Sequence, residues 1–348
     1  MEILNQKEKF LVIQTAFPGD AILTLPMIQK LKEKYSGSLI DVLCIPSTKE
    51  IFLSSPAVDN VIVYDKKDKQ KSFSDFLMII RKIRAENYSR IFSPHRSFRS
   101  SIIVWFSKCK ETYGFDNASF SFIYKYKIHY EKNKHEVERN LNLIKYDTSN
   151  SNWRIFPTIK FTDEIENKIE KLIQSIDKKI IAVAPGSVWN TKIYPEEYYK
   201  LLVDYLIYRN YYVIFIGGKE DKILCERLNN KFAENTLSLA GKLSIIETIT
   251  LLKKCSLLIC NDSAPTHMAM AAQIPVLTIY CSTVPEFGFY PYSSISDFIS
   301  YDGLKCKPCG IHGHKKCPIN TFDCGYLLTP DMVIEKVNNL LSVKKKSV

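Results

Sequence analysis

Two loops in the second half of the chain carry side chains that suit a phosphate group. The strand-like run from Ile180 to Ala184 leads into a Pro-Gly-Ser turn and then to Lys192. A second strand-like run, Cys255 to Cys260, leads into a polar turn and a helix-like segment. Hydroxyl groups, a lysine and the open N–H groups of a helix start bind phosphate oxygens well. The two loops predict a nucleotide-diphosphate site made by Ser187, Lys192, Asp262, Ser263, Ala264 and His267.

Each of these loops also has a plainer interpretation. The first can be an ordinary exit from a strand, with Lys192 pointing into solvent. In the second, Asp262 can be an N-cap of the helix that follows. The repetition of strand, small-residue turn and polar side chains favours the diphosphate site over two coincidences.

A carboxylate stands in a comparable place near the N-terminus. The apolar run Phe10 to Gln14 is followed by a turn containing Pro18, Gly19 and Asp20, and then by a segment of helical periodicity. On local sequence alone, Asp20 is an N-cap. Its position on the first loop after a strand also suits a general base.

A third polar cluster follows the strand-like run Arg90 to Ser93. The loop contains His95, Arg96 and Arg99, whose charges suit an anionic acceptor, although a solvated helix start has the same composition. Further along, His135 and Arg139 fall at helical spacing and therefore share one helix face. We predict an acceptor site made by His95, Arg96, Arg99, His135 and Arg139.

Two weaker indications of a nucleotide site come from loops that lie between Lys192 and Asp262 in the sequence. Gly217 and Gly218 end a buried strand-like run, and Glu220 can accept hydrogen bonds from a ribose. Leu243, before another helix-like segment, can lie against a nucleobase. A plain tight turn explains the glycines equally well.

The elements that carry these loops alternate between strand and helix along the chain. Strand-like runs at 39–45, 61–64 and 212–216 separate helix-like segments such as 73–85. This βαβ pattern predicts an α/β protein with largely parallel, doubly wound sheets. A chain of 348 residues favours two domains. We place them at 1–175 and 176–330, followed by a C-terminal helix and basic tail at 331–348.

The composition of the chain limits the kinds of partner that it can bind. The net charge of +11 implies an anionic partner, which can be a nucleic acid, a membrane surface or a phosphorylated substrate. No apolar run approaches the about 18 residues of a membrane-spanning helix, and the N-terminus lacks a secretory signal, which predicts a cytosolic protein. Residues 120–145 interleave aromatic residues, among them Phe120 and Phe122, with lysines, a pattern that suits base stacking. The alternation of Tyr124, Tyr126 and Ile128 with lysines fits an exposed sheet edge or a loop equally well.

The ten cysteines fall into two groups. Six are scattered, mostly through apolar segments, and are expected to be reduced core residues. The other four form the pattern Cys306-x2-Cys309-x7-Cys317-x6-Cys324. They suit a zinc site in part, because Cys-x2-Cys is one usual half of such a site, but the second half lacks that spacing. A reduced or disulfide-linked loop is the alternative.

The motifs, in this order, resemble those of the bacterial ADP-heptose:lipopolysaccharide heptosyltransferases, which form glycosyltransferase family nine. The resemblance runs from Phe10 to Cys324 and includes the cysteine loop, which is similar to that of the second-heptose branch. The matching residues are Gly19 to Leu23, His95 to Ser100, His135 to Leu141, Ala184 to Ser187 with Lys192, and Asp262 to His267.

The resemblance implies a GT-B architecture, in which two Rossmann-like, doubly wound domains face a cleft. It implies inverting transfer of a heptose from ADP-heptose to the lipid A-Kdo inner core of lipopolysaccharide, with no metal ion and no cofactor besides the ADP-sugar co-substrate. Asp20 is then the general base, and Lys192 and Ser187 bind the diphosphate of the leaving ADP. Asp262, Ser263, Ala264 and His267 complete the donor site, with Glu220 at the ribose and Leu243 at the adenine.

The same resemblance places the protein in the cytoplasm, peripheral at the inner face of the cytoplasmic membrane, with an anionic glycolipid and no nucleic acid as partner. Ala264 stands where the family usually has glycine, and Ile193 with Tyr194 where tryptophan is usual. These departures leave two alternatives: a transferase of the same fold with another nucleotide sugar, or a non-catalytic protein that binds nucleotides or nucleic acid.

Overall fold

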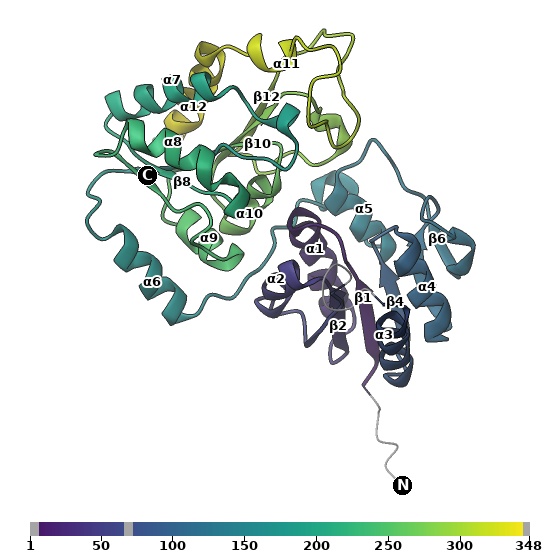
Figure 1. Cartoon of the computed structure of the whole chain (residues 1–348). Coiled ribbons are helices and arrows are strands. Elements are labelled where there is room, and N and C mark those ends of the chain that lie inside the picture. The colour runs from purple at the N-terminus through teal and green to yellow at the C-terminus, as the bar shows by residue number, and fades with distance from the viewer. Residues whose placement is uncertain (1–6, 66–71, 344–348) are drawn as a thin grey trace. The chain divides into compact units, whose positions relative to one another are not determined.

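The computed structural model describes residues 7–65 and 72–343, which form two compact units (Figure 1). The division falls between Lys160 and Phe161. Each unit contains one six-stranded sheet in which all paired strands are parallel. The expected α/β class with two doubly wound sheets is confirmed.

The first unit has the strand order β3-β2-β1-β4-β5-β6. Its strands are β1 (Lys9–Ile13), β2 (Leu39–Cys44), β3 (Asn60–Val63), β4 (Arg90–Ser93), β5 (Glu111–Phe115) and β6 (Tyr126–Ile128). Its helices are α1 (Pro18–Lys34), α2 (Lys49–Leu53), α3 (Phe73–Ala85), α4 (Phe98–Ser107) and α5 (Glu136–Leu143), with 3₁₀ turns η1 (Pro46–Thr48), η2 (Ser121–Ile123) and η3 (Ser149–Ser151).

The second unit repeats this arrangement, with the order β12-β11-β10-β7-β8-β9. Its strands are β7 (Ile180–Ala184), β8 (Tyr212–Phe215), β9 (Thr236–Ser238), β10 (Leu257–Asn261), β11 (Val276–Tyr280) and β12 (Asp297–Ser300). Its helices are α6 (Asp163–Ile173), α7 (Glu196–Tyr208), α8 (Lys222–Lys231), α9 (Ile245–Leu252), α10 (Ala264–Ala272), α11 (Asp323–Tyr326) and α12 (Pro330–Val343), with η4 (Asn190–Lys192), η5 (Lys219–Asp221) and η6 (Pro285–Phe287).

The first strand of each unit lies in the middle of its sheet. Val12 of β1 pairs with Val42 on one side and Phe92 on the other. Val183 of β7 pairs with Phe215 and Ile259 in the same way. Central parallel strands are covered on both faces, which explains why β7 throughout, and β1 after Lys9, are runs of buried apolar residues.

The chain order reverses at these central strands. In each sheet the chain first moves outward on one side of the central strand and then returns to build the other side. Ligands of doubly wound folds bind at the carboxyl ends of the strands that flank this reversal. The positions predicted to bind ligands are therefore the loops after β1 and β4, and those after β7 and β10.

The unit boundary differs from the expected division at 175/176. Helix α6, which the sequence analysis placed in the first domain, packs against α9 of the second unit. Lys254 pairs with Glu170 at 2.8 Å, and the Lys253 ammonium lies 4.1 Å from the Phe161 ring centroid. The charged face of α6 therefore contacts a helix of the second unit.

The C-terminal helix α12 is part of the second unit rather than a separate segment. It packs against α7, and its residues Val333 and Val337 are fully buried in the core of that unit. The Tyr205 hydroxyl of α7 donates to Asn338 at 2.7 Å. The basic residues 344–348 lie outside the described part of the chain.

The tyrosines near 124–130 are mostly packed inside the first unit. Tyr124 is buried and lies within hydrogen-bonding distance of Ser101, while Tyr126 on edge strand β6 stacks on Tyr113. Tyr130 is also buried. These three rings are engaged in internal packing, so the alternation of tyrosines with lysines belongs to a sheet edge, whereas Phe120 and Phe122 of the same stretch are exposed. Among the described residues, no helix is long and apolar enough to cross a membrane.

Candidate functional site

In the first unit, the loops at the strand reversal bring Asp20 and Arg96 into electrostatic range of each other. Asp20 follows β1, and Arg96 follows β4. His95 connects the two loops: its Nδ1 lies 2.9 Å from Thr15 Oγ1 and 2.9 Å from Ser100 Oγ. His95 therefore holds the two loops together.

Asp20 is not an N-cap. Helix α1 is capped by Phe17, whose side chain makes no capping bond, and begins with Pro18, which suits the first helical position. Asp20 is the third residue of the helix, and its side chain is partly buried. The N-cap interpretation is wrong, and the interpretation as a general base stays a prediction.

The surroundings of Asp20 raise its pKa from 3.8 to about 7. Burial is the main cause, because it disfavours the charged carboxylate, and the nearby Glu136 carboxylate adds to the shift. Backbone amides at Phe17 and Asp20, and the Arg96 guanidinium, act in the opposite direction. A carboxylate with a pKa near neutral pH suits proton abstraction from a hydroxyl group.

Arg96 stacks on a ring that a second arginine also contacts. The Arg96 guanidinium carbon lies 4.0 Å from the Tyr130 ring centroid, and that of Arg139 lies 4.6 Å from it. Arg96 is only half-buried, so it remains available to an anionic ligand. Arg139 is 2% exposed.

Arg139 is a structural residue in this unit. It donates to Glu136 Oε2 and to the Tyr130 hydroxyl, each at 2.8 Å, and to the carbonyls of Glu131 and Lys132 at 2.9 and 2.7 Å. These bonds engage all three guanidinium nitrogens. The prediction that Arg139 contacts the acceptor is therefore corrected: it holds Glu136, and Glu136 in turn acts on Asp20.

His135 is corrected in the same way. Its side chain is 1% exposed, accepts from the Val137 N–H at 3.2 Å as the N-cap of α5, and stacks on Trp153 with ring centroids 4.9 Å apart. His135 and Arg139 do lie on one side of α5, as their spacing predicts, but both side chains are buried in the first unit.

Replacing Arg139 by alanine is expected to destabilise the first unit by about 3 to 5 kcal/mol, because Glu136 would be left buried without its partner. The exposed Arg99, in the same predicted acceptor set, provides the matched control, and Arg99→Ala should leave stability unchanged. Denaturant unfolding of both variants measures the difference. If the two variants were equally stable, Arg139 would have no structural role, and the prediction that it contacts the acceptor would stand.

In the second unit, the loops after β7 and β10 meet through an ion pair. Lys192 Nζ lies 2.6 Å from Asp262 Oδ2 and donates to the Asp262 carbonyl at 3.2 Å. Both side chains are largely buried. Thr283, after β11, donates to the same carboxylate oxygen at 2.7 Å. Lys192 is thus a positioned cation at the strand reversal, not a solvated lysine.

Asn261, which the sequence analysis did not select, joins the same loops. Its amide nitrogen donates to the Pro185 carbonyl at 2.7 Å, while its amide oxygen accepts from the Tyr194 N–H and the Tyr199 hydroxyl at 3.0 and 2.9 Å. Asn261 is fully buried and is the last residue of β10. It fixes the turn after β7 to the end of β10, and a polar residue ending a buried strand was its only sequence signal.

Helix α10 begins beside this ion pair. Its N-cap is Ser263, which makes no side-chain capping bond, and its first residues are Ala264 and Pro265. The positive end of its dipole adds to the Lys192 charge. The N-terminus of α10 is therefore suited to an anion, as predicted.

His267, one turn into α10, is buried, and its Nδ1 has no hydrogen-bond partner among the described residues. Burial lowers its pKa from 6.5 to about 4, although the Asp262 carboxylate opposes the shift. At neutral pH the imidazole is therefore uncharged and can donate or accept one hydrogen bond.

The remaining predicted donor residues lie on adjoining loops of the same sheet edge. Ser187 is half-buried in the turn after β7. Glu220 is exposed after β8, and Leu243 is half-buried after β9; their loops are joined by the hydrogen bond from Gly241 N–H to the Gly217 carbonyl at 3.0 Å. The structure thus brings the predicted donor-binding residues to the loops after β7, β8, β9 and β10.

The cysteine loop packs on the loop of Lys192. Thr191 accepts from the His314 N–H at 2.8 Å, and its own N–H donates to the His314 carbonyl at 3.0 Å. All ten cysteines are free thiols. Within residues 7–65 and 72–343, no three histidine, cysteine, aspartate or glutamate side chains are arranged to hold a metal ion, so the geometry does not support the zinc interpretation.

Comparison with known proteins gives consistent matches. The sequence profile described as glycosyltransferase family 9 (heptosyltransferase) matches residues 76–318. Lipooligosaccharide heptosyltransferase 2 of Haemophilus ducreyi is 24% identical, with 96% of this chain and 99% of that protein covered. The solved structure of Escherichia coli ADP-heptose lipopolysaccharide heptosyltransferase II gives a TM-score of 0.79 at 20% identity, covering 97% of this chain and 99% of that one. Escherichia coli heptosyltransferase WaaC, solved with ADP-2-deoxy-2-fluoro heptose, gives 0.71 at 17% identity, covering 95% and 99%.

Proposed function

Because the chain belongs to glycosyltransferase family 9, the heptosyltransferases, we propose that it transfers a heptose from ADP-heptose to the inner core of lipopolysaccharide. The acceptor in this proposal is the lipid A-Kdo glycolipid, at the cytoplasmic face of the inner membrane. The GT-B architecture, with a Rossmann-like sheet in each unit, matches that of the solved heptosyltransferases.

The proposal rests on one observation: the loops at the strand reversal of each unit carry a different group that the reaction needs. The first unit holds a carboxylate, Asp20, whose pKa is raised to about 7. The second holds a cation, Lys192, beside the open N-terminus of α10. A base for an acceptor hydroxyl and a positive site for a leaving diphosphate are what transfer from a nucleotide sugar requires.

The proposed reaction is a single displacement. Asp20 takes the proton of the acceptor hydroxyl, the hydroxyl oxygen bonds to the anomeric carbon, and the bond from that carbon to the diphosphate breaks. The configuration at the sugar carbon is therefore inverted. Lys192 and the α10 amides offset the charge that develops on the departing ADP, so the proposal requires no metal ion. Arg96 binds the anionic acceptor next to Asp20.

Donor identity is tested by thermal unfolding with a panel of ADP-, UDP- and GDP-sugars. ADP-heptose is expected to stabilise the protein by about 2.7 kcal/mol at about 100 times its Kd, because it binds only the folded chain. The shift should persist in EDTA. A larger shift with a UDP- or GDP-sugar would identify the alternative donor, and tight, salt-dependent binding of an oligonucleotide without transfer would contradict the enzyme assignment.

A further inference from the structure

Helix α4 departs from an ordinary surface helix, because it exposes three large aromatic residues and buries serines beside Ile103 and Val104. Surface helices bury apolar residues and expose polar ones. Three of the residues that α4 buries are serines, and the hydroxyl of each has a hydrogen-bond partner within the first unit. The Ser100 hydroxyl lies 2.9 Å from His95 Nδ1. Ser101 donates to the Ser119 carbonyl, and Ser107 donates to the Val104 carbonyl at 2.6 Å. Its exposed large residues are Phe98, Trp105 and Phe106.

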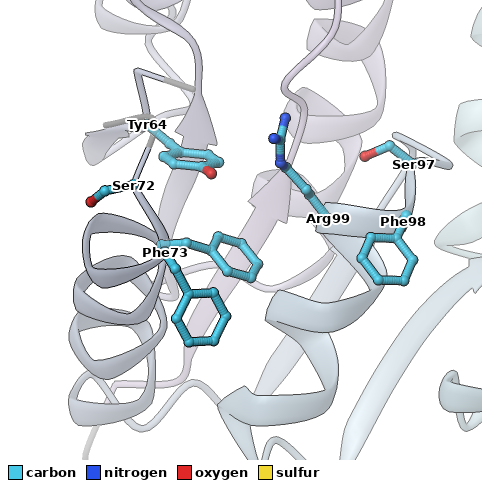
Figure 2. Close-up of a pocket in the computed structure, with 7 residues that line it drawn as sticks. Tyr64, Ser72, Phe73, Ser97, Phe98 and Arg99 are labelled. Atoms are coloured by element: carbon cyan, nitrogen blue, oxygen red, sulfur yellow. The ribbon is translucent and has the colours of Figure 1, made fainter. Parts of the chain in front are cut away.

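The exposed aromatic side chains continue beyond α4. The Phe98 ring lies 5.1 Å from that of Phe120, which lies 5.6 Å from that of Phe122. On the other side, Phe98 and Arg99 border a hollow of about 570 Å³ that Phe73 of α3 also lines (Figure 2). We call the following residues the aromatic face: Phe73, Phe98, Trp105, Phe106, Phe120 and Phe122.

The exposure of this face is large. Phe73 is 76% exposed, Phe122 69% and Trp105 55%. Single exposed apolar residues are common in soluble proteins, but a contiguous group such as Phe98, Phe120 and Phe122 is typical of an interaction site. Trp105 extends it along α4, because it lies seven residues after Phe98 and so shares its helix face. None of the six belongs to the buried core of the first unit, which includes Tyr124 and Phe115.

Positive charge is concentrated in the same part of the chain as the aromatic face: Arg99 lines the hollow beside Phe98, and the other exposed cations lie on α3, which packs against α4, or directly after α4. Between residues 73 and 127 there are ten lysines and arginines and four acidic residues, which supplies more than half of the net charge of +11. Six of these cations are exposed and form no ion pair with another described residue: Arg81, Lys82, Arg84, Arg99, Lys108 and Lys110. The partner of this surface must therefore accept aromatic rings and supply negative charge.

We propose that the aromatic face docks the first unit on an anionic lipid bilayer, with the rings at the headgroup boundary and the six cations against lipid phosphates. Aromatic residues favour that boundary, and each basic residue adds attraction to an anionic leaflet. A second copy of the chain fits less well, because a symmetric pair would place the same cations against one another.

The position of the face relates it to the acceptor. Phe98 and Arg99 follow Arg96 by two and three residues, so the loop beside Asp20 leads directly into the docking helix. This part of the inference rests on the proposed function, since it identifies the acceptor as a glycolipid. Docking would keep the sugar-binding loop at the membrane surface where the lipid part of the acceptor resides.

Vesicle flotation of the full-length protein tests the docking. The wild type is expected to float with vesicles of phosphatidylethanolamine and phosphatidylglycerol, and to do so less at high salt. The double substitution Trp105→Ser and Phe106→Ser should weaken partitioning about tenfold, because two rings that enter the headgroup boundary on docking are lost. Tyr208→Ser on α7, where Tyr208 is 86% exposed, is the matched control and should float like the wild type. Unchanged flotation of the double variant would overturn the proposal.

The fluorescence of Trp105 also reports how deeply this residue enters the bilayer. Lipids with brominated acyl chains should quench wild-type fluorescence on vesicle binding. Trp105→Phe should remove most of that quenching, because Trp153 is largely buried and Trp189 belongs to the second unit, where it is half-buried and stacks on His312. Quenching that persists in Trp105→Phe would place another part of the protein in the membrane. Sedimentation of the wild type and the double variant completes the test: a wild-type dimer that the double substitution dissociates would assign the face to self-association and reject docking.

Transfer assays separate this inference from the proposed function. The double variant should keep wild-type transfer to a water-soluble, deacylated acceptor and lose transfer to the intact, acylated acceptor embedded in vesicles. Equal losses with both acceptors would reject the docking role. Absence of transfer in the wild type would reject the proposed function, while the flotation result would still stand on its own.

Discussion

Replacing Asp20 by asparagine is expected to reduce turnover by about a thousandfold or more, because the acceptor hydroxyl would lose its general base. Donor binding should persist, since the residues predicted to bind the donor belong to the second unit. Single-turnover transfer and calorimetric ADP titration measure the two quantities. Normal turnover by this variant would show that another group accepts the proton.

The pH profile of the wild type gives an independent test of the same role. A base must be deprotonated to act, so kcat/KM should rise with pH through about 7, the value to which the pKa of Asp20 is raised. An acid limb near pH 4 would instead indicate a carboxylate with an ordinary pKa.

Stability should change in the opposite direction from activity. The pKa of Asp20 is higher in the folded chain than in the unfolded chain, so its stabilising effect is present at low pH and is lost as pH rises through about 7. Asparagine removes that dependence. We expect Asp20→Asn to be about 2 kcal/mol more stable than the wild type at pH 8, about half of the full shift because the side chain is partly exposed to solvent. The gain should vanish near pH 4. A gain of equal size at both pH values would mean that charge is not its cause.

The fold was predictable where a strand is a continuous apolar run. The runs at 90–93 and 180–184 have the same bounds in the sequence analysis and in the structure. Strands β9 and β12 were not predicted, because they are short and partly polar, and they are defined by pairing with β8 and β11. The boundary was misplaced because local composition does not reveal that α6 packs on α9.

The candidate site divides along similar lines. Asp20, Lys192 and Asp262 were identifiable because each follows a predicted strand, and loops after parallel strands meet at one edge. Helical spacing placed His135 and Arg139 on one face, but it carries no information on whether that face is buried. Asn261 and Glu136 were missed because their roles depend on partners far away in the sequence.

Replacing Lys192 by alanine is expected to weaken donor binding at least about tenfold and to slow transfer about a hundredfold or more, because charge on the departing diphosphate would lose its main cation. ADP titration and single-turnover transfer separate the two effects. Lys222→Ala, an exposed lysine of α8, is the control and should match the wild type. Unchanged transfer together with tight ADP binding would reject the placement of the diphosphate beside Lys192.

The ion pair makes this prediction more specific. In Lys192→Ala the Asp262 carboxylate, which lies 2.6 Å from the lysine in the wild type, would remain largely buried with Thr283 as its only described side-chain partner. It would then repel the diphosphate as well as failing to attract it. The double variant Lys192→Ala, Asp262→Asn should therefore bind ADP more tightly than Lys192→Ala alone, because the repulsion is removed. If Asp262 instead contacts the donor directly, the double variant should bind more weakly than the single one, so the sign of this difference decides whether Asp262 positions the lysine or holds the sugar nucleotide itself.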